Sequence, residues 1–557
     1  MPLGILNDVY LDQVPGTVAL VHKRKAQSGL NEVILVPKPS NDPLDPLNWP
    51  RWRKECIFWV LALGGALGSS TGHLLNPGFV ELSKEWGVSV NAFKEGVGNG
   101  RSFSTIDKNN TKLLIIRIMC SFCPWVSPLA VKYGRRPVYL TAALLLFFGT
   151  IWSGLSQGLQ SFTGSRIIQG FGVAAFESVM TASIGDIYFV SVFSRVHQRG
   201  LRTAIWSFGL TAGVNVAPIV NGYVISSPRF ISALFGILCL LVIFLVPETA
   251  YKRQHRYAID SSGASELVPR KAPSIEASNL KNEFEEVAKS SLGEKDPANT
   301  FIFEAHDDIQ IHTPRHDIKQ LLPWSGYKDE KSLFKIFLRP FPFLLSPVVF
   351  YGVFIFGLTF IWLILLSIIT STVFALPPYH FNTRQVGLVS IGPMVGSLIG
   401  TIISGPLCDL VTTAFAKRNK GIYEPEARLL LIIPMFIFQV GGYIGWAILA
   451  SKGAHWIGPV SMYTIINLGQ SIGNTAAIAY IIDVHRENAA ECFAIINFVK
   501  DVVLYGFAQF ANSWVAEMGV LRVFGVLAGM SGFCMLTTIP MYIYGKRARS
   551  FVARHPQ

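Results

Sequence analysis

The stretch Tyr133-Gly134-Arg135-Arg136-Pro137 is a short basic turn between two long apolar segments, at about 111–131 and 138–154. It belongs to a larger pattern, because apolar segments of similar length recur along the chain in two sets. A polar stretch at about 251–335 separates these sets. The pattern indicates two similar membrane-embedded halves joined by a polar linker.

The composition also indicates a membrane protein. Of the 557 residues, 50% are hydrophobic and 15% are charged, and the mean hydropathy is +0.40, whereas soluble domains carry about 25% charged residues. The 39 Phe and 12 Trp suit lipid-facing helices with aromatic belts. The net charge of +13 is typical of cytoplasmic loops rich in Lys and Arg. We therefore expect a lipid bilayer, and no nucleic acid, as a partner.

A membrane helix needs about 20 mostly apolar residues. We predict an all-α membrane protein with about twelve transmembrane helices in two six-helix bundles. The predicted spans are 57–75, 111–131, 138–154, 166–189, 203–225 and 230–246, then 345–374, 386–404, 429–450, 457–481, 493–514 and 523–544. The expected domains are a cytoplasmic N-terminal segment (1–55), an N-terminal bundle (56–250), a largely disordered cytoplasmic linker (251–340), a C-terminal bundle (341–545) and a cytoplasmic tail (546–557).

Positive charges predict the orientation of these helices. With an even number of spans, both chain ends lie on one side of the membrane. The loops on that side contain Lys132, Arg135, Arg136, Arg195, Arg199, Arg202, Lys417, Arg418, Lys420, His485 and Arg486, and the tail adds Lys546, Arg547 and Arg549. Because cytoplasmic loops carry an excess of positive charge, we expect both termini and the linker to be cytoplasmic.

The seven cysteines lie in or beside apolar segments and indicate no disulfide framework. Cys120-x-x-Cys123 has the spacing of a redox or metal pair, but an apolar helix holds it and no second pair follows, so we interpret it as packing. The chain has no P-loop, no His-Glu-x-x-His zinc helix and no nucleophile elbow. We expect neither enzymatic activity nor ATP-driven work, and neither a metal nor another cofactor.

Several motifs carry a family resemblance. They are the segment 42–49 before the first span, the loop 127–136, Arg166-x-x-Gln169-Gly170 in the fourth span, a glycine-proline pattern at 209–222, and Pro247-Glu248-Thr249 after the sixth span. In this order they resemble the major facilitator superfamily, and within it the fungal drug:proton antiporter-like group with about twelve helices. The resemblance covers about 42–546 and implies two bundles that work by alternating access.

The loop 127–136 resembles the family's gating loop between helices two and three. Gly would make its tight turn, and the Arg pair would bond helix ends. We assign the gating role to Gly134, Arg135, Arg136, Asp186 and Asp409. Val131 stands where the family has Asp, so the usual acidic partner is missing here, whereas the second-half counterpart at 405–409 retains its acid. Asp186 is expected to anchor loop arginines near the cytoplasm.

Charged residues inside a membrane are costly and are therefore candidates for function. Arg166 and Glu177 are 11 positions apart, which returns to nearly the same helix face about 16 Å along the axis. Gln169 lies on that stripe. We assign proton coupling to Glu177, with Arg166 and Gln169, because Glu177 would lie near the midplane, where substrate and proton sites gather in this fold. The alternative is a structural hydrogen bond from Glu177 to a neighbouring helix.

Polar stripes on other spans are candidates for the lining of a substrate cavity. Four polar residues of the tenth span recur at i, i+3, i+4 and i+7 on one face, and the eleventh span has a matching stripe. We assign to the cavity Asn215, Asn467, Gln470, Asn474, Asn497 and Asp501. The alternative is that such stripes join helices, and that Lys500 and Asp501 form an internal pair serving stability only.

These assignments predict a proton-coupled secondary transporter of a small organic solute. The resemblance implies drugs, polyamines or similar solutes, and a cavity lined by aromatic and amide groups suits amphipathic organic cations. The expected partners are this solute and protons, and the expected state is a monomer in the plasma membrane. Two alternatives are a nutrient sensor that retained the fold and a passive facilitator.

Three segments depart from the family pattern, at 100–118, 191–196 and 226–228. The first puts charged residues where the second span should begin, and each would cost roughly 2.5–3.5 kcal/mol at the membrane centre. The last leaves a sixth span of only about 17 apolar residues. A misplaced splice boundary and a genuine divergent loop explain the insertion equally.

Overall fold

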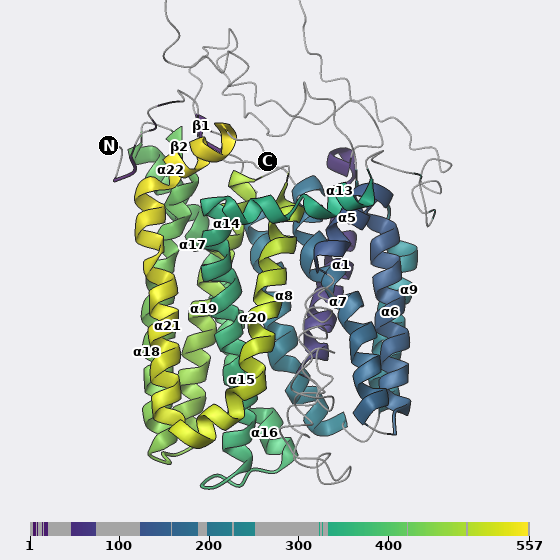
Figure 1. Cartoon of the computed structure of the whole chain (residues 1–557), viewed down its shortest axis with the longest axis vertical. Coiled ribbons are helices and arrows are strands. Elements are labelled where there is room, and N and C mark those ends of the chain that lie inside the picture. The colour runs from purple at the N-terminus through teal and green to yellow at the C-terminus, as the bar shows by residue number, and fades with distance from the viewer. Residues whose placement is uncertain are drawn as a thin grey trace, which may run out of the picture.

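The computed structural model describes residues 4–6, 8, 10, 14, 16–19, 46–73, 123–157, 159–187, 198–224, 228–250, 322, 326, 332–419, 422–485 and 488–554. These residues form an α-helical protein whose long helices run side by side (Figure 1). The segments 100–118 and 191–196, residues 226 and 227, and most of the linker at 251–340 lie outside the described residues. What the sequence predicts for them stays a prediction.

The long helices coincide with the predicted spans, of which the second is described only from Cys123 onward. The first half contains α1 (Arg51–Thr71), α5 (Cys123–Tyr133), α6 (Arg135–Leu155), α7 (Leu159–Ile187), α8 (Gln198–Val224) and α9 (Pro228–Leu245). The second half contains α14 (Pro347–Gly352), η4 (Val353–Leu358) and α15 (Thr359–Ala375), then α16 (Thr383–Val389) and α17 (Ile391–Arg418), α18 (Ile432–Ser451), α19 (Ile457–Val484), α20 (Ala489–Met518), and α21 (Val520–Leu536) with α22 (Thr538–Arg554). Within the described ranges, seven segments are long and apolar enough to cross a membrane, and Phe230–Leu245 is a shorter apolar helix.

Several helices extend beyond the predicted spans, because apolar run length marks only the membrane-embedded part of a helix. The first helix begins at Arg51 rather than at 57, and the eighth span continues through α17 to Arg418 rather than ending at 404. The twelfth span is divided at Thr537 and continues to Arg554 rather than to 544. α17 and α22 both end in basic residues, which interact favourably with the negative end of the helix dipole.

Short elements complete the described fold. They are η1 (Pro46–Asn48), α13 (Leu333–Leu338), η3 (Phe341–Leu345), η5 (Pro425–Leu431) and the strands β1 (Val18–Ala19) and β2 (Ile422–Tyr423). α13 lies at the end of the predicted linker, and its Phe337 stacks on Trp125 of α5 with ring centroids 4.0 Å apart. The end of the linker is therefore packed against the first half.

The N-terminal segment packs on the second half of the chain. β1 pairs antiparallel with β2, which lies between α17 and α18. Ile5 is fully buried against Phe415 and Ala427, and the amide of Leu6 donates to the carbonyl of Ile543 at 3.1 Å. Both chain ends lie at the same end of the molecule (Figure 1).

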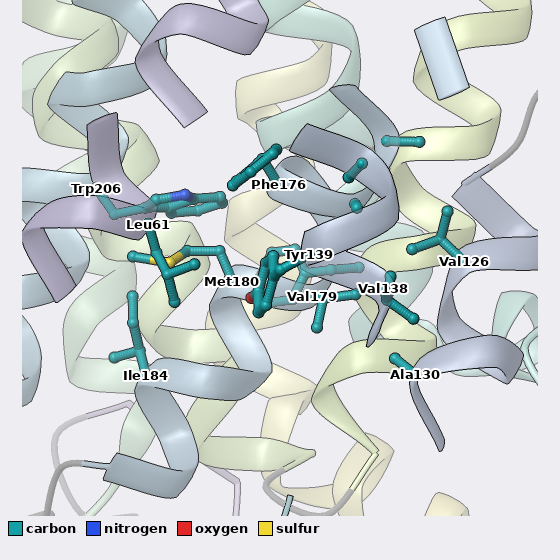
Figure 2. Close-up of a cluster of buried hydrophobic side chains, with 14 of the residues drawn as sticks. Leu61, Val126, Ala130, Val138, Tyr139, Phe176, Val179, Met180, Ile184 and Trp206 are labelled. Atoms are coloured by element: carbon teal, nitrogen blue, oxygen red, sulfur yellow. The ribbon is translucent and has the colours of Figure 1, made fainter. Parts of the chain in front are cut away.

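The two halves meet along two sets of helices. α8 of the first half packs against α16, α17 and α19, and α20 of the second half packs against α5 and α7. A large apolar cluster supports this arrangement, and Figure 2 shows Tyr139, Phe176 and Trp206 within it. The Tyr139 hydroxyl lies 2.9 Å from Ser183 Oγ, so the polar end of this buried ring has a partner.

Close backbone contact between α1 and α8 depends on glycine. A Cβ atom at Gly213 would clash with the carbonyl oxygen of Ala66 and with Ser69 Oγ. We expect Gly213→Ala to lower the free energy of unfolding by about 1–3 kcal/mol, because backbone atoms must move to accommodate the methyl group. Thermal unfolding of the purified protein in detergent measures this change.

Gly441 of α18 provides the matched control. A Cβ atom there meets no heavy atom within 4 Å, and Ala favours a helix over Gly by roughly 1 kcal/mol. Gly441→Ala should therefore be neutral or slightly stabilising. Equal unfolding temperatures for the two variants would contradict the close approach of α1 and α8.

Candidate functional site

An ion pair between α7 and α20 joins the two halves. Lys500 Nζ of α20 lies 2.8 Å from Glu177 Oε2 of α7, and the exposed fractions of the two side chains are 5% and 14%. Glu177 is ten residues from the end of α7 at Ile187, and Lys500 is eleven residues from the start of α20 at Ala489. At a rise of 1.5 Å per residue, both lie roughly 15 Å from those helix ends. Both positions therefore lie well inside their helices, which have 29 and 30 residues.

Aromatic, amide and acidic groups surround this pair. Lys500 Nζ lies 5.5 Å from the ring centroid of Phe360 in α15, directly after the π-helical turn η4; such turns are frequent at functional sites. Asn497 lies one helical turn before Lys500 and is buried, and neither polar atom of its amide has a hydrogen-bond partner among the described residues. Asp501 is also buried.

Arg166 and Gln169 lie in a separate network within the first half. Arg166 Nη1 donates to the carbonyl of Thr71 at 2.6 Å and to Gln169 Oε1 at 2.9 Å. Gln169 Nε2 donates to Thr150 Oγ1 at 3.3 Å. These bonds join α1, α6 and α7 and place a cation at the C-terminus of α1, where the helix dipole favours it. The predicted stripe therefore divides, because Glu177 bonds to α20 instead.

The polar face of α19 bonds largely within the second half. Gln470 Nε2 donates to Thr359 Oγ1 at 3.1 Å and to Asn474 Oδ1 at 2.8 Å. Gln439 of α18 donates to Gln470, and its own Oε1 accepts from Ser531 Oγ of α21 at 3.1 Å. Gln470 and Asn474 are buried. In this conformation these two amides join helices.

Asn215 provides a second polar contact between the halves. Its Nδ2 donates to Asn467 Oδ1 of α19 at 3.1 Å, and Ser397 Oγ of α17 is 3.4 Å away. All three side chains are buried. Two cavity residues predicted from distant parts of the chain are therefore brought together at the contact of α8 with the second half.

Glu248, which the sequence analysis did not include in the gating loop, holds this loop in place. Gly134 has φ +95°, a conformation that favours glycine. The carboxylate of Glu248 accepts from the backbone amides of Arg135 at 2.9 Å and Arg136 at 3.2 Å. The Arg136 guanidinium donates to carbonyls at the end of α9, including Ile243 at 2.9 Å. Glu248 therefore supplies a carboxylate to this loop in the absence of an acid at position 131, and the gating role stays a prediction.

Asp409 and Asp186 are the other two residues to which we assigned a gating role. Asp409 is half-buried in α17, and Asp186 belongs to α7, but its side chain lies outside the described residues. Glu491 at the start of α20 is buried and lies 3.7 Å from Arg339. The charge of Arg135 also acts on Glu491. Glu491 is therefore an acid of the second half that pairs with an arginine at the end of the linker.

A buried polar cluster lies at the same end of the second half. Arg428 Nε donates to Asp483 Oδ2 at 2.9 Å, and the Tyr423 hydroxyl donates to the same oxygen at 2.7 Å. Burial raises the pKa of the Tyr423 phenol above its ordinary value, so this hydroxyl stays protonated and donates. The cluster joins β2, η5 and α19.

A second charged cluster ties the two ends of the chain to this region. The guanidinium of Arg549 donates to Glu426 through two bonds of 2.9 Å and to Glu424 Oε2 at 2.8 Å. Thr17 of the N-terminal segment donates to Glu424 at 3.0 Å, and Lys546 lies 2.7 Å from the same carboxylate. Arg549 and both glutamates are buried.

His485 does not carry the positive charge expected of it in the loop after α19. It is buried, and burial lowers its pKa to about 4. Its Nε2 lies 3.1 Å from Ser346 Oγ. At neutral pH it is therefore uncharged, and the predicted orientation depends on the arginine and lysine residues alone.

Glu248 and Arg549 hold the ends of helices together, whereas sequence reasoning gave Glu248 no such role and used Arg549 only as a positive charge of the tail. The signal for Glu248 was its place in Pro247-Glu248-Thr249, directly after a span and on the same side as the gating loop. Arg549 followed the last predicted span, among other basic residues that suggested an exposed tail. Its burial has no local sequence signal.

Comparison with known proteins identifies the fold family. The family model described as Major Facilitator Superfamily matches residues 116–504. This chain belongs to the Major Facilitator Superfamily. The order of the sequence motifs and the arrangement of twelve spans in two halves agree with that membership.

This major facilitator protein is similar to fungal relatives along most of its length. "Uncharacterized MFS-type transporter C1271.10c" of Schizosaccharomyces pombe is 25% identical, over 98% of this chain and 94% of the relative. "Protein HOL1" of Saccharomyces cerevisiae is 24% identical over 98% and 96%. "Probable drug/proton antiporter YHK8" of the same yeast is 28% identical over 76% and 74%.

Solved structures agree on the fold. The proton:xylose symporter XylE has a TM-score of 0.53 over 89% of this chain and 96% of its own, at 14% identity. The human organic anion transporter MFSD10 has a TM-score of 0.51 over 88% and 100%, also at 14% identity. The predicted fold class is confirmed, and the chain is a multi-pass membrane transporter of this superfamily.

Proposed function

We propose that this chain is a proton-coupled secondary transporter of a small organic cation, and that its two bundles alternate in exposing a central site. The observation that carries the proposal is the partly buried ion pair between Glu177 and Lys500. It lies at the contact between the halves, well inside α7 and α20, and transporters of this fold have their coupling sites between the two halves. Ionisable groups inside a membrane are costly, and proton relays are among their established uses.

The pair offers a physical route from proton binding to bundle movement. Glu177 belongs to α7 and Lys500 to α20, so their attraction holds the two halves together. A proton on Glu177 removes the negative charge and with it the attraction that holds the ammonium. Protonation then favours separation of α7 from α20, which rocking of the bundles requires. Asn215 and Asn467 form a second contact that the same movement would open.

A cationic solute fits the remaining groups of the site. Asp501 and Asn497, whose amide has no hydrogen-bond partner among the described residues, lie within one helical turn of Lys500 on α20. A similar yeast protein bears the name of a drug/proton antiporter. Drugs and polyamines are the solute classes that we propose, with both termini cytoplasmic and a monomer in the plasma membrane. Gln470 and Asn474 would join the cavity in a conformation that opens their present bonds.

Flux measurements in liposomes test the proposal against its alternatives. The purified chain is reconstituted, a pH gradient is imposed, and radiolabelled spermidine and tetraphenylphosphonium serve as probes. We expect at least one probe to reach a transmembrane concentration ratio that collapses when an uncoupler is added. Equilibration that ignores the uncoupler would instead identify a passive facilitator. Movement of neither probe would contradict an organic-cation transporter and favour a sensor.

A further inference from the structure

Two groups attract the ammonium of Lys500, a carboxylate and an aromatic ring. Glu177 Oε2 lies 2.8 Å from Nζ, and the ring centroid of Phe360 lies 5.5 Å from it. A carboxylate combined with an aromatic face is a common arrangement for binding an ammonium group. Phe360 is itself buried, so both groups act on the cation with little screening by water.

The three groups come from different helices that the fold brings together. Glu177 belongs to α7 of the first half, whereas Phe360 and Lys500 belong to α15 and α20 of the second half. Gly357 in the π-helical turn before α15 lies next to Lys500, where an added Cβ would be 3.7 Å from Lys500 Cβ. The lysine stem therefore lies against this turn at ordinary contact distance.

The side-chain amide of Asn497 lies beside the position of the Lys500 ammonium. Asn497 precedes Lys500 by three positions, so the two side chains share a helix face. Its amide nitrogen and oxygen are both buried and lack hydrogen-bond partners within the described part of the chain. A buried amide without partners loses roughly 1–3 kcal/mol. A polar group of a bound solute would recover this loss.

We propose that Glu177 and the face of Phe360 form a binding site for the alkylammonium group of the substrate, and that Lys500 fills this site until a substrate amine displaces it. The proposal rests on the proposed transport of an organic cation. Lys500 is then a specificity-determining residue, because a solute must bring an ammonium of its own to replace the lysine. A neutral solute of the same shape cannot replace the ammonium of Lys500 and gains no binding free energy from this site. The Asn497 amide takes a second, uncharged polar group of the same solute.

The first test measures binding of n-hexylamine, which is an ammonium ion at neutral pH, with n-hexanol as its neutral counterpart. Thermal unfolding of the purified full-length chain in detergent reports binding. In Lys500→Met, no lysine ammonium competes for the site. Hexylammonium should therefore stabilise the variant at concentrations at least about tenfold lower than those that stabilise the wild type, because every molecule of the variant has the site open. Hexanol should act equally on both.

Further variants exclude a general effect of the substitution. Lys500→Arg keeps a competing cation and should not gain affinity. Glu177→Gln combined with Lys500→Met should lose the gain, because the carboxylate is absent. Phe360→Leu in the Lys500→Met background should weaken binding by roughly two- to fivefold, as expected for a lost cation–π contact. If Lys500→Met does not yield folded protein, Lys500→Gln takes its place, because it also removes the charge but keeps a polar group at the end of the side chain.

The outcomes separate this proposal from the proposed transport mechanism. Equal amine dependence in the wild type and Lys500→Met would overturn the ammonium site, as would a gain that persists without the Glu177 carboxylate. Neither measurement uses a proton gradient. The ammonium site can therefore stand even where proton coupling fails, and coupling can stand where the ammonium site fails.

Discussion

Glu177→Gln should abolish the proton-driven concentration ratio of the transported cation while leaving the protein in the membrane. The amide retains an oxygen that accepts from Lys500 Nζ, 2.8 Å away in the wild type, but it neither binds nor releases a proton. One pH unit is worth about 1.36 kcal/mol per proton, which corresponds to a tenfold ratio. We expect this tenfold ratio to fall to one in the variant, measured in proteoliposomes with a one-unit gradient.

Glu517→Gln provides the matched control for this experiment. Glu517 lies on the same helix as Lys500 but is exposed near its far end. Its substitution removes one acidic group from the protein without touching the ion pair, so the concentration ratio should stay at its wild-type value. An unchanged pH-dependent ratio in Glu177→Gln would show that the proton is carried elsewhere.

Arg549→Met should strongly destabilise the protein. The guanidinium is the buried partner of two buried carboxylates, those of Glu424 and Glu426. Its removal leaves one carboxylate with Lys546 and Thr17 and deprives the other of its cation. Breaking a buried pair by removing one partner typically costs about 3–5 kcal/mol. The free energy of unfolding in mixed micelles is the measurement, and proteolysis near the N-terminus is expected to increase.

Arg547→Met controls for the loss of a positive charge from the same helix. Arg547 is two positions away and exposed, and exposed ion pairs contribute roughly 0–1 kcal/mol. The free energy of unfolding of Arg547→Met should therefore be close to that of the wild type. If Arg549→Met and Arg547→Met were equally stable, the buried cluster would not hold the chain ends in place.

The spans could be predicted because the information that defines them is local. Each one is a run of apolar residues long enough to cross the bilayer, and the basic turn at 133–137 with its motifs identified the family. Local hydropathy does not predict where a helix ends outside the membrane. α17 continues to Arg418 and α22 to Arg554 beyond the apolar runs, because helical hydrogen bonds do not require apolar side chains.

The candidate site was only partly accessible from sequence. Helical spacing placed Glu177 near mid-depth, and it placed Gln470 and Asn474 on one face. Spacing does not reveal which neighbour a face meets. The face of α19 bonds within its own half, through Gln439 and Thr359, whereas only Asn467 reaches across to the first half among the described α19 amides. The neighbour of each face depends on how the helices pack.

The sequence by itself determined the membrane class, the apolar spans and the superfamily, because all of these follow from residue type and short-range spacing. Only the tertiary structure decided the partner of each charge. Glu177 and Lys500 are 323 positions apart, and the backbone of Arg136 bonds to Glu248 across 112 positions. Such pairs form when helices from distant parts of the chain pack together, and a charge excluded from water then takes whichever opposite charge the packing brings within reach.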